Sequence, residues 1–437
     1  MSGAGRRAAK TAAAGTGSPG TGSSGTPSAG TRAARIAAGV GIGALAIVGA
    51  AAAATAALSV VAARTVLTPP SRRVEDVPIR RVDLRAGLIV LGSNPESRMP
   101  GEYSFWFDQV AGHARVGEII AQTPSTVTRR LLGVDFGDLT TARRGRMSGW
   151  FYLHPSDLDG VAWSDVEIPT PLGAAPAWYV PADASRVSED WAILVHGRAV
   201  QRPETLRAVP PFRAEGYDCL VVSYRNDGEA PRSHDYRYAL GDREWHDVDA
   251  AIGYALAHGA KRVVLMGWSM GGATVLQAMS RSAHRDAVQG VVLESPVVDW
   301  ITTLDFQAKA HRMPWPVRLG ALTLIRARWG RVFTGLAEPL DLARLDFVTR
   351  AAEIDRPVLI LHSDDDGFVP SAASRALALA RPDLVSFEEF QVARHVKLWN
   401  YDRDRWEAAI RVWLGELSGA RRRRSRAETS TPSSAEA

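Results

Sequence analysis

Between about residue 165 and residue 417, short apolar segments alternate with segments of helical periodicity, and this alternation most constrains the fold. Apolar runs bounded by glycine or polar residues are typical of buried strands. Such runs occupy residues 191–195, 219–224, 263–266, 290–293 and 358–361. Strands that alternate with helices predict a mostly parallel sheet covered by helices on both faces. In such a sheet, reacting groups lie on the loops after the strands.

One of these loops carries the motif Gly267-Trp268-Ser269-Met270-Gly271, between a predicted strand and a predicted helix. A G-x-S-x-G in this context holds its serine on a tight, strained turn. Glycine at positions 267 and 271 suits this turn, because we expect a side chain there to collide with neighbouring backbone. The helix N-terminus beside the serine favours developing negative charge. The motif therefore predicts Ser269 as a nucleophile.

A neutral serine hydroxyl needs a base, and the base needs an acid that fixes its tautomer. This turn predicts the chain order serine, acid, histidine. Asp366 follows the strand at 358–361, and His395 follows the last predicted strand, so both lie on loops beyond strand ends. The sequence leaves four other acids as weaker alternatives: Asp364, Asp365, Glu294 and Asp299. His196 and His362, at strand ends, are expected to be structural.

With these residues in place, residues 165–417 resemble serine hydrolases of the α/β-hydrolase superfamily, close to its prolyl oligopeptidase-like and serine-aminopeptidase-like branch. That branch carries its acid in the pattern H-G-x-x-D-x-x-V-P, which maps onto residues 362–370 and selects Asp366. Ser363 stands where the family usually has glycine. The family histidine commonly precedes Trp-Asn, and Trp399-Asn400 follow His395.

Two backbone N–H groups are expected to bind the oxyanion that forms on a substrate carbonyl. The N–H of Met270 directly follows the nucleophile, and the resemblance implies that the second belongs to Arg198, just beyond His196-Gly197. For the side chain of Arg198, an acidic substrate group and a surface position both remain open.

The resemblance implies a serine hydrolase that forms an acyl-enzyme, and we expect an esterase on small or lipid-like acyl substrates. A serine peptidase and a non-catalytic, membrane-tethered binding protein are the alternatives. We expect neither a cofactor nor a metal. A helical insertion at about residues 300–345 is expected to form a lid over the site.

The N-terminal part contains a segment suited to a membrane. Residues 1–35 are rich in Ala, Gly, Ser and Thr and predict a disordered basic tail. Residues 36–63 carry no charge and are long enough to cross a bilayer. A single-pass anchor is expected, with a cleaved signal sequence or an alanine-rich soluble helix as alternatives. Basic residues flank both ends, and we expect the large domain to be extracytoplasmic.

The remaining segments carry no recognised chemistry. Residues 80–160 predict a small β-rich region, and residues 418–437 a second disordered basic tail. No aromatic and basic motif points to nucleic acid, so membrane lipid and a small acylated substrate are the expected partners. The single cysteine, Cys219, lies in an apolar strand and is expected to be a buried thiol.

Overall fold

The computed structural model describes residues 29–182 and 188–430, with side chains within 47–182 and 188–419. Its first helix, α1, is Ala29–Leu67 and contains a stretch, Ile47–Leu67, that is long and apolar enough to cross a membrane. The sequence predicted a disordered tail over residues 1–35, but residues 29–35 of this segment are helical and form the start of α1. Residues 1–28 lie outside the described residues. The chain divides within α1 into the units Met1–Ala54 and Thr55–Ala437.

A closed barrel of six antiparallel strands follows α1, where the sequence predicted a small β-rich region. Its strands lie in the order β1-β2-β5-β4-β3-β6. They are β1 (Val77–Asp83), β2 (Leu88–Gly92), β3 (Tyr103–Phe107), β4 (Gly112–Gln122), β5 (Thr126–Phe136) and β6 (Arg144–Ser148). Phe105 and Phe107 fill the interior, and a glycine faces each ring. A Cβ on Gly145 would lie 2.4 Å from the Phe105 ring, and a Cβ on Gly112 would lie 2.0 Å from the Phe107 ring.

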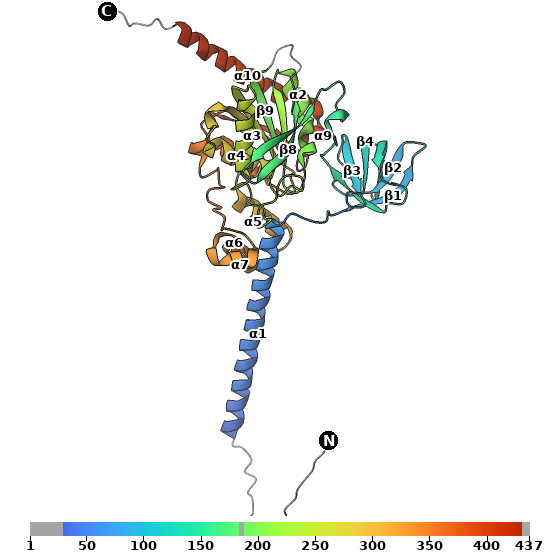
Figure 1. The fold of residues 1–437 in the computed structure, drawn as a ribbon. Helices are drawn as coiled ribbons and strands as arrows, with labels where there is room; N and C mark the ends of the chain where they lie inside the picture. Colours follow the sequence, from blue (N-terminus) through green and yellow to red (C-terminus); the bar gives the residue numbers. More distant parts are fainter. Residues whose placement is uncertain (1–28, 183–187, 431–437) are drawn as a thin grey trace, which may run out of the picture. The chain divides into compact units, whose positions relative to one another are not determined.

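The second region, which contains the strands labelled β8 and β9 in Figure 1, is an eight-stranded, mostly parallel sheet in the order β14-β13-β12-β11-β9-β10-β8-β7. Only β8 runs antiparallel to its two neighbours. The strands are β7 (Ser164–Thr170), β8 (Gly173–Val180), β9 (Asp190–Val195), β10 (Asp218–Val222), β11 (Arg262–Trp268), β12 (Val288–Glu294), β13 (Val358–Ser363) and β14 (Val385–Phe390).

Helices cover both faces of this sheet, so the side chains of its central strands are buried on both sides. Along β9, Trp191, Ile193 and Val195 belong to one apolar layer, and Ala192 and Leu194 to the other. The first layer includes α3 (Trp245–Ala257), α4 (Met270–Arg281) and α8 (Ser371–Ala380). The second includes α2 (Val209–Ala214), α9 (Leu398–Tyr401) and α10 (Arg403–Ser430). The two layers fix the strand ends on which the site is built.

The insertion between β12 and β13 is helical, as predicted for residues 300–345. It contains α5 (Trp300–Ala310), α6 (Trp315–Arg326) and α7 (Arg331–Thr334). The carboxylate of Asp299 caps α5 by accepting hydrogen bonds from the N–H groups of Ile301 (2.8 Å) and Thr302 (3.2 Å). Buried residues of α6 join the first apolar layer, and so do Ala63 and Leu67 at the end of α1.

The C-terminal region, which was expected to be disordered over residues 418–437, is helical in its first part. Helix α10 continues to Ser430, through the arginine run at 421–424, and residues 431–437 lie outside the described part of the chain. Arginine and alanine are good helix formers, so this run extends a helix that packing had already started.

Candidate active site

Ser269 lies at the turn between β11 and α4. Its backbone adopts φ 50° and ψ −116°, a conformation that costs a non-glycine residue about 1–3 kcal/mol and persists only where its surroundings impose it. The Ser269 N–H donates to the Glu294 carbonyl at 3.0 Å, and its own carbonyl accepts from the N–H groups of Gly272 and Val297, both at 3.0 Å. These three hydrogen bonds hold the strained turn.

The glycines on either side of Ser269 are required by the closeness of the backbone around them. A Cβ on Gly267 would lie 2.4 Å from the Gly271 carbonyl oxygen. A Cβ on Gly271 would lie 2.3 Å from the carbonyl oxygen of Val195 and 2.4 Å from that of His196. The collisions predicted at positions 267 and 271 are therefore present.

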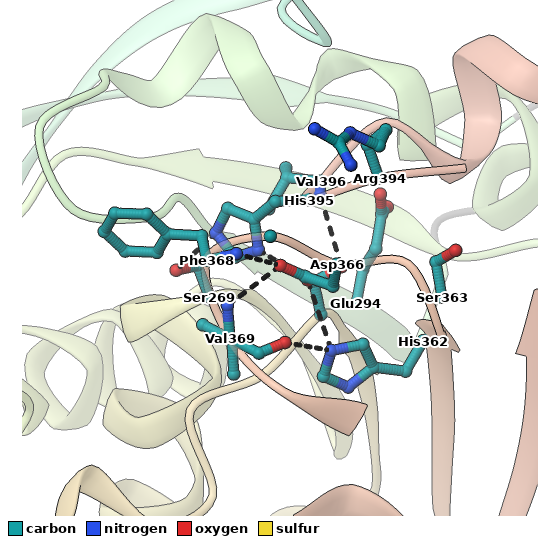
Figure 2. Close-up of polar contacts among 12 residues, drawn as sticks. Ser269, Glu294, His362, Ser363, Asp366, Phe368, Val369, Arg394, His395 and Val396 are labelled. Carbon is teal, nitrogen blue, oxygen red and sulfur yellow. Dashed lines mark hydrogen bonds and ion pairs between the residues drawn. The ribbon is translucent and has the colours of Figure 1, made fainter. Parts of the chain in front are cut away.

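The structure brings the predicted base and acid next to Ser269, as Figure 2 shows. The Nε2 atom of His395 lies 3.1 Å from the Oγ atom of Ser269. The Nδ1 atom of His395 lies 2.7 Å from the Oδ2 atom of Asp366. With Nδ1–H donating to the carboxylate, Nε2 is left to accept the serine hydroxyl hydrogen. This is the arrangement in which a histidine acts as a base toward a serine.

Asp366 is buried, and its surroundings favour its ionised form. Its Oδ1 atom accepts hydrogen bonds from the N–H groups of Phe368 and Val369, both at 2.8 Å. Burial alone would raise the pKa of the Asp366 carboxyl, but attraction to His395 and hydrogen bonds from His362 and His395 outweigh it and hold this pKa below its ordinary value. The carboxylate therefore stays charged at neutral pH.

His362 also contacts Asp366, and the sequence had suggested only a structural histidine there. Its Nε2 atom lies 3.2 Å from Asp366 Oδ2 and 3.0 Å from the Val369 carbonyl oxygen. Both neighbours are acceptors, so Nε2 carries the hydrogen, while Nδ1 lies 2.8 Å from the Ser374 hydroxyl. His362 thus binds the same carboxylate oxygen as His395 and helps to orient it.

The alternative acids bind other groups. Asp364 accepts hydrogen bonds from the Ser371 hydroxyl (2.8 Å) and Arg375 (2.6 Å). Asp365 accepts from the Ser363 hydroxyl and the Arg394 N–H, both at 2.8 Å. Both belong to the turn that carries Asp366.

Of the two acids near β12, Asp299 caps α5 and Glu294 lies buried below the site. The carboxylate of Glu294 accepts from the indole N–H groups of Trp268 (2.7 Å) and Trp406 (3.0 Å) and from the Leu398 N–H (3.3 Å). Burial raises the pKa of the Glu294 carboxyl. Its neighbours place it under the loop of His395, as a structural group.

The backbone around the predicted oxyanion donors is fixed beside Ser269. Met270 is the first residue of α4, so its N–H has no acceptor within the helix. Gly197, which precedes Arg198, lies so close that a Cβ on it would be 3.3 Å from the Cβ of Ser269. The Tyr224 hydroxyl donates to the Gly197 carbonyl at 2.8 Å and steadies this loop. The donor roles of Met270 and Arg198 stay predictions.

The side chain of Arg198 takes neither of the positions that the sequence left open. Its guanidinium donates to the carbonyl oxygens of Thr65 (2.7 Å), Val66 (3.0 Å) and Thr68 (3.1 Å). Carbonyls at a helix C-terminus lack partners within the helix and carry partial negative charge. Arg198 thus caps α1 and ties the loop beside Ser269 to the end of that helix.

The loop of His395 is strained and is held from outside by the barrel. Arg394 and Val396, on either side of the histidine, have φ of 60° and 54°, which is unfavourable for both residue types. Glu96, on the loop between β2 and β3, forms ion pairs with Arg394 (3.2 Å) and Lys397 (2.9 Å). One barrel carboxylate therefore binds both sides of this loop, a contact that no local sequence signal indicates.

Asn400 joins the same loop to the barrel and to the segment before α2. Its carbonyl accepts from the Glu102 N–H at 3.1 Å, and its Nδ2 donates to the Glu102 carbonyl at 2.8 Å. Arg207 donates to Asn400 Oδ1 at 2.9 Å and to the Val396 carbonyl at 3.1 Å. The position of His395 thus depends on segments far away in the sequence.

The helical insertion at residues 300–345, which is expected to form a lid and is called the lid below, contacts the site through α5. The side chain of Gln307 donates to the carbonyl oxygens of Phe368 (2.6 Å) and Gly367 (3.3 Å). The exposed Phe368 ring lies 5.1 Å from the imidazole of His395, measured between centroids. An apolar ring therefore borders the histidine on the side where the lid is attached.

Comparison with known proteins agrees with this division of the chain. A model of the alpha/beta hydrolase family matches residues 192–410, half of the chain. A model described as a domain of unknown function (DUF8805) matches residues 78–148, the barrel. No match was found among curated proteins.

Several solved structures resemble the chain over its larger region. The Pyrococcus furiosus esterase Pf2001 is 18% identical, with 60% of this chain and 95% of that chain covered and a TM-score of 0.47. Esterase RhEst1 from Rhodococcus sp. ECU1013 is 18% identical, with 58% and 99% covered and a TM-score of 0.41. A bromoperoxidase from Bacillus anthracis is 18% identical, with 58% and 100% covered and a TM-score of 0.41.

Proposed function

Because the chain belongs to the alpha/beta hydrolase family, we propose that it is a serine hydrolase with Ser269, His395 and Asp366 as its triad. The supporting observation is the chain of contacts from Ser269 Oγ to His395 Nε2 (3.1 Å) and from His395 Nδ1 to Asp366 (2.7 Å). A histidine placed between a strained serine and a buried carboxylate activates the serine and stabilises its own charged form.

In the proposed reaction, the Ser269 oxygen attacks the substrate carbonyl while its proton moves to His395 Nε2. The carbonyl oxygen becomes negatively charged beside the N–H groups of Met270 and Arg198, each expected to contribute roughly 3 kcal/mol to transition-state stabilisation. The bond to the leaving group then breaks, and the leaving oxygen takes the proton from His395. Water attacks the acyl-enzyme by the same route, releasing the acid and restoring the serine hydroxyl.

We propose an ester of a small or lipid-like acyl group as the substrate. The exposed, apolar ring of Phe368 borders His395, and it suits an acyl chain better than a charged peptide terminus. Neither proton transfer nor oxyanion binding in this scheme needs a cofactor. A serine peptidase with the same triad is the alternative that the substrate screen below addresses.

The first experiment is labelling of the full-length protein, in detergent, with a fluorophosphonate probe. We expect the wild type to be labelled and Ser269→Ala to remain unlabelled while its thermal unfolding is unchanged. Labelling that persists in Ser269→Ala would remove this serine from the mechanism. A folded wild type that never reacts would favour a membrane-tethered binding protein.

A second experiment separates esterase from peptidase. Nitrophenyl esters of increasing acyl length and peptidyl nitroanilides are compared by kcat/KM on the same preparation. The proposal predicts turnover of the esters, with a preference among chain lengths. Faster turnover of the anilides would favour the peptidase.

We also propose that the protein is a single-pass membrane protein with its catalytic domain outside the cytoplasm. The uncharged run at residues 36–63, part of which lies in the apolar stretch Ile47–Leu67 of α1, supports a membrane span, and a long domain can be translocated despite nearby basic residues. Protease treatment of intact cells should digest the catalytic domain. Complete protection, with digestion only after lysis, would contradict this orientation.

A further inference from the structure

The lid carries a group of exposed apolar side chains. Five large side chains on α6, α7 and the turn between them are 45% to 82% exposed. They are Trp315, Leu319, Trp329, Val332 and Phe333, and we call them the lid face. Exposed apolar groups of this size commonly mark a surface that binds a partner or a membrane.

The segments that carry the lid face also bind the end of α1 (Figure 1). The Ser59 hydroxyl lies 3.1 Å from the Val317 carbonyl oxygen on α6. The Arg64 side chain donates to the Phe333 carbonyl oxygen on α7 at 2.6 Å. Gly320 lets the two helices approach, because a Cβ there would lie 2.3 Å from the Ser59 hydroxyl oxygen. The lid face therefore lies on the part of the molecule where α1 ends.

The length of the preceding sequence places this contact at the edge of a bilayer. The uncharged run before Ser59 extends from residue 36 to residue 58. At ~1.5 Å per residue, a helix of that length measures about 34 Å, and the hydrocarbon core of a bilayer is roughly 30 Å thick. If residues 36–58 cross the membrane, Ser59, which binds the lid, emerges at its surface.

The charge of the lid suits such a surface. Residues 311–334 contain no acidic residue and five arginines. These are Arg312, Arg318, Arg326, Arg328 and Arg331; Arg318 is paired with Asp305 of α5. Arginine combined with tryptophan and aliphatic side chains is typical of segments that lie in the boundary between headgroups and acyl chains.

We propose that the lid face is a membrane-binding surface, inserted into the headgroup boundary of the same bilayer that α1 crosses, with anionic phospholipid as its partner. This proposal depends on the proposed membrane span but not on catalysis. It gives the lid a second attachment beside α1. Because α5 contacts the carbonyls of Phe368 and Gly367 next to His395, the attachment also brings the candidate site near the membrane surface.

The single cysteine of the chain makes this surface accessible to a specific probe. Cys219 is fully buried, so a cysteine introduced at an exposed position reacts selectively with an environment-sensitive fluorophore. Val332→Cys places the fluorophore on the lid face. Val412→Cys is the matched control, since it is 63% exposed on α10, a helix that packs on the other apolar layer of the sheet.

The labelled full-length proteins are reconstituted into phosphatidylcholine vesicles with and without phosphatidylglycerol, some of them carrying lipids spin-labelled near the headgroup. We expect a blue-shifted emission from position 332 that the spin labels quench, more strongly in the anionic vesicles, and a water-like, unquenched emission from position 412. The same result is expected when Ser269→Ala is added, so failure of the proposed function would not change it.

Three outcomes would overturn the proposal. The first is equal emission and quenching at positions 332 and 412, and the second is loss of the protein from the vesicle fraction. The third is a shielded but unquenched label at 332 that self-quenches as the labelled fraction rises, which would assign the lid face to a second copy of the chain. Equal quenching in neutral and anionic vesicles would overturn the preference for anionic lipid.

Discussion

Replacement of Asp366 by asparagine is the most informative single change, because the hydrogen bonds around this side chain determine how an amide must lie. The Oδ1 position accepts two backbone N–H groups, at 2.8 Å each, so it must be filled by the amide oxygen. The amide NH2 then faces His395 Nδ1 and His362 Nε2, where the carboxylate oxygen lies 2.7 Å and 3.2 Å away. An NH2 group there can only donate.

The imidazole of His395 then has to accept at Nδ1, which moves its hydrogen to Nε2. An Nε2–H cannot take the proton of Ser269, so the variant loses its base. In the best-known triad the same change lowers kcat by about 10⁴-fold. Because each factor of ten in rate corresponds to about 1.36 kcal/mol, the activation free energy rises by ~5.4 kcal/mol. Asp366 is buried and does not touch substrate, so KM should stay near the wild-type value.

The assay is hydrolysis of a nitrophenyl ester by the full-length protein in detergent micelles, with kcat and KM measured separately. Asp364→Asn is the matched control: it changes the same turn but contacts Ser371 and Arg375, and its kcat should be unchanged. If Asp366→Asn kept kcat within tenfold of the wild type, the acid would have to be another residue and the geometric reasoning would be refuted.

The contacts described above lead to predictions for two further substitutions and for one pH dependence. Glu96→Gln removes the charge that pairs with both sides of the His395 loop and should lower kcat roughly tenfold without raising KM. The control, Glu118→Gln, alters an exposed ion pair of the barrel and should leave kcat and KM unchanged. Equal kinetics in the two variants would argue against the barrel as a support for this loop. Gly271→Ala places a Cβ 2.3 Å from a backbone oxygen of β9 and should lower the free energy of unfolding by about 1–3 kcal/mol, so an unchanged denaturation midpoint would count against the tight turn. The pKa of Asp366 is lower in the folded than in the unfolded protein. The contribution of its carboxylate to the free energy of unfolding should therefore be complete above about pH 4 and diminish as the pH falls below that value. A stability difference between wild type and Asp366→Asn that stays constant on acidification would contradict this sign.

The sequence predicted the larger region well because its local signals agree with its tertiary structure. The strands at 191–195, 263–266 and 358–361 are apolar runs closed by glycine or polar residues, and each has a neighbouring strand on both sides in the sheet. The α/β-hydrolase fold expected from these runs and from the resemblance is confirmed by the family match. The segment after β9 forms a 3-10 helix over Arg202–Ala208 before α2.

The three proposed triad residues could be selected because each follows a strand in a fixed chain order and because family motifs surround two of them. The groups that support them could not. Glu96, Arg207 and the end of α1 lie far from His395 and Ser269 in sequence, and only the folded chain brings them together. Closure of the barrel likewise depends on strand register, which apolar runs of five residues do not specify.

The most direct test of the proposed chemistry is to trap the acyl-enzyme. The full-length protein is mixed with an excess of a slowly turned-over ester, quenched in acid within the pre-steady-state burst, digested and mapped by mass spectrometry. The proposed mechanism predicts one acyl group on the peptide that contains Ser269, and none when His395→Ala is treated in the same way. An acyl group on another residue, or steady turnover with no covalent adduct at any time, would contradict it.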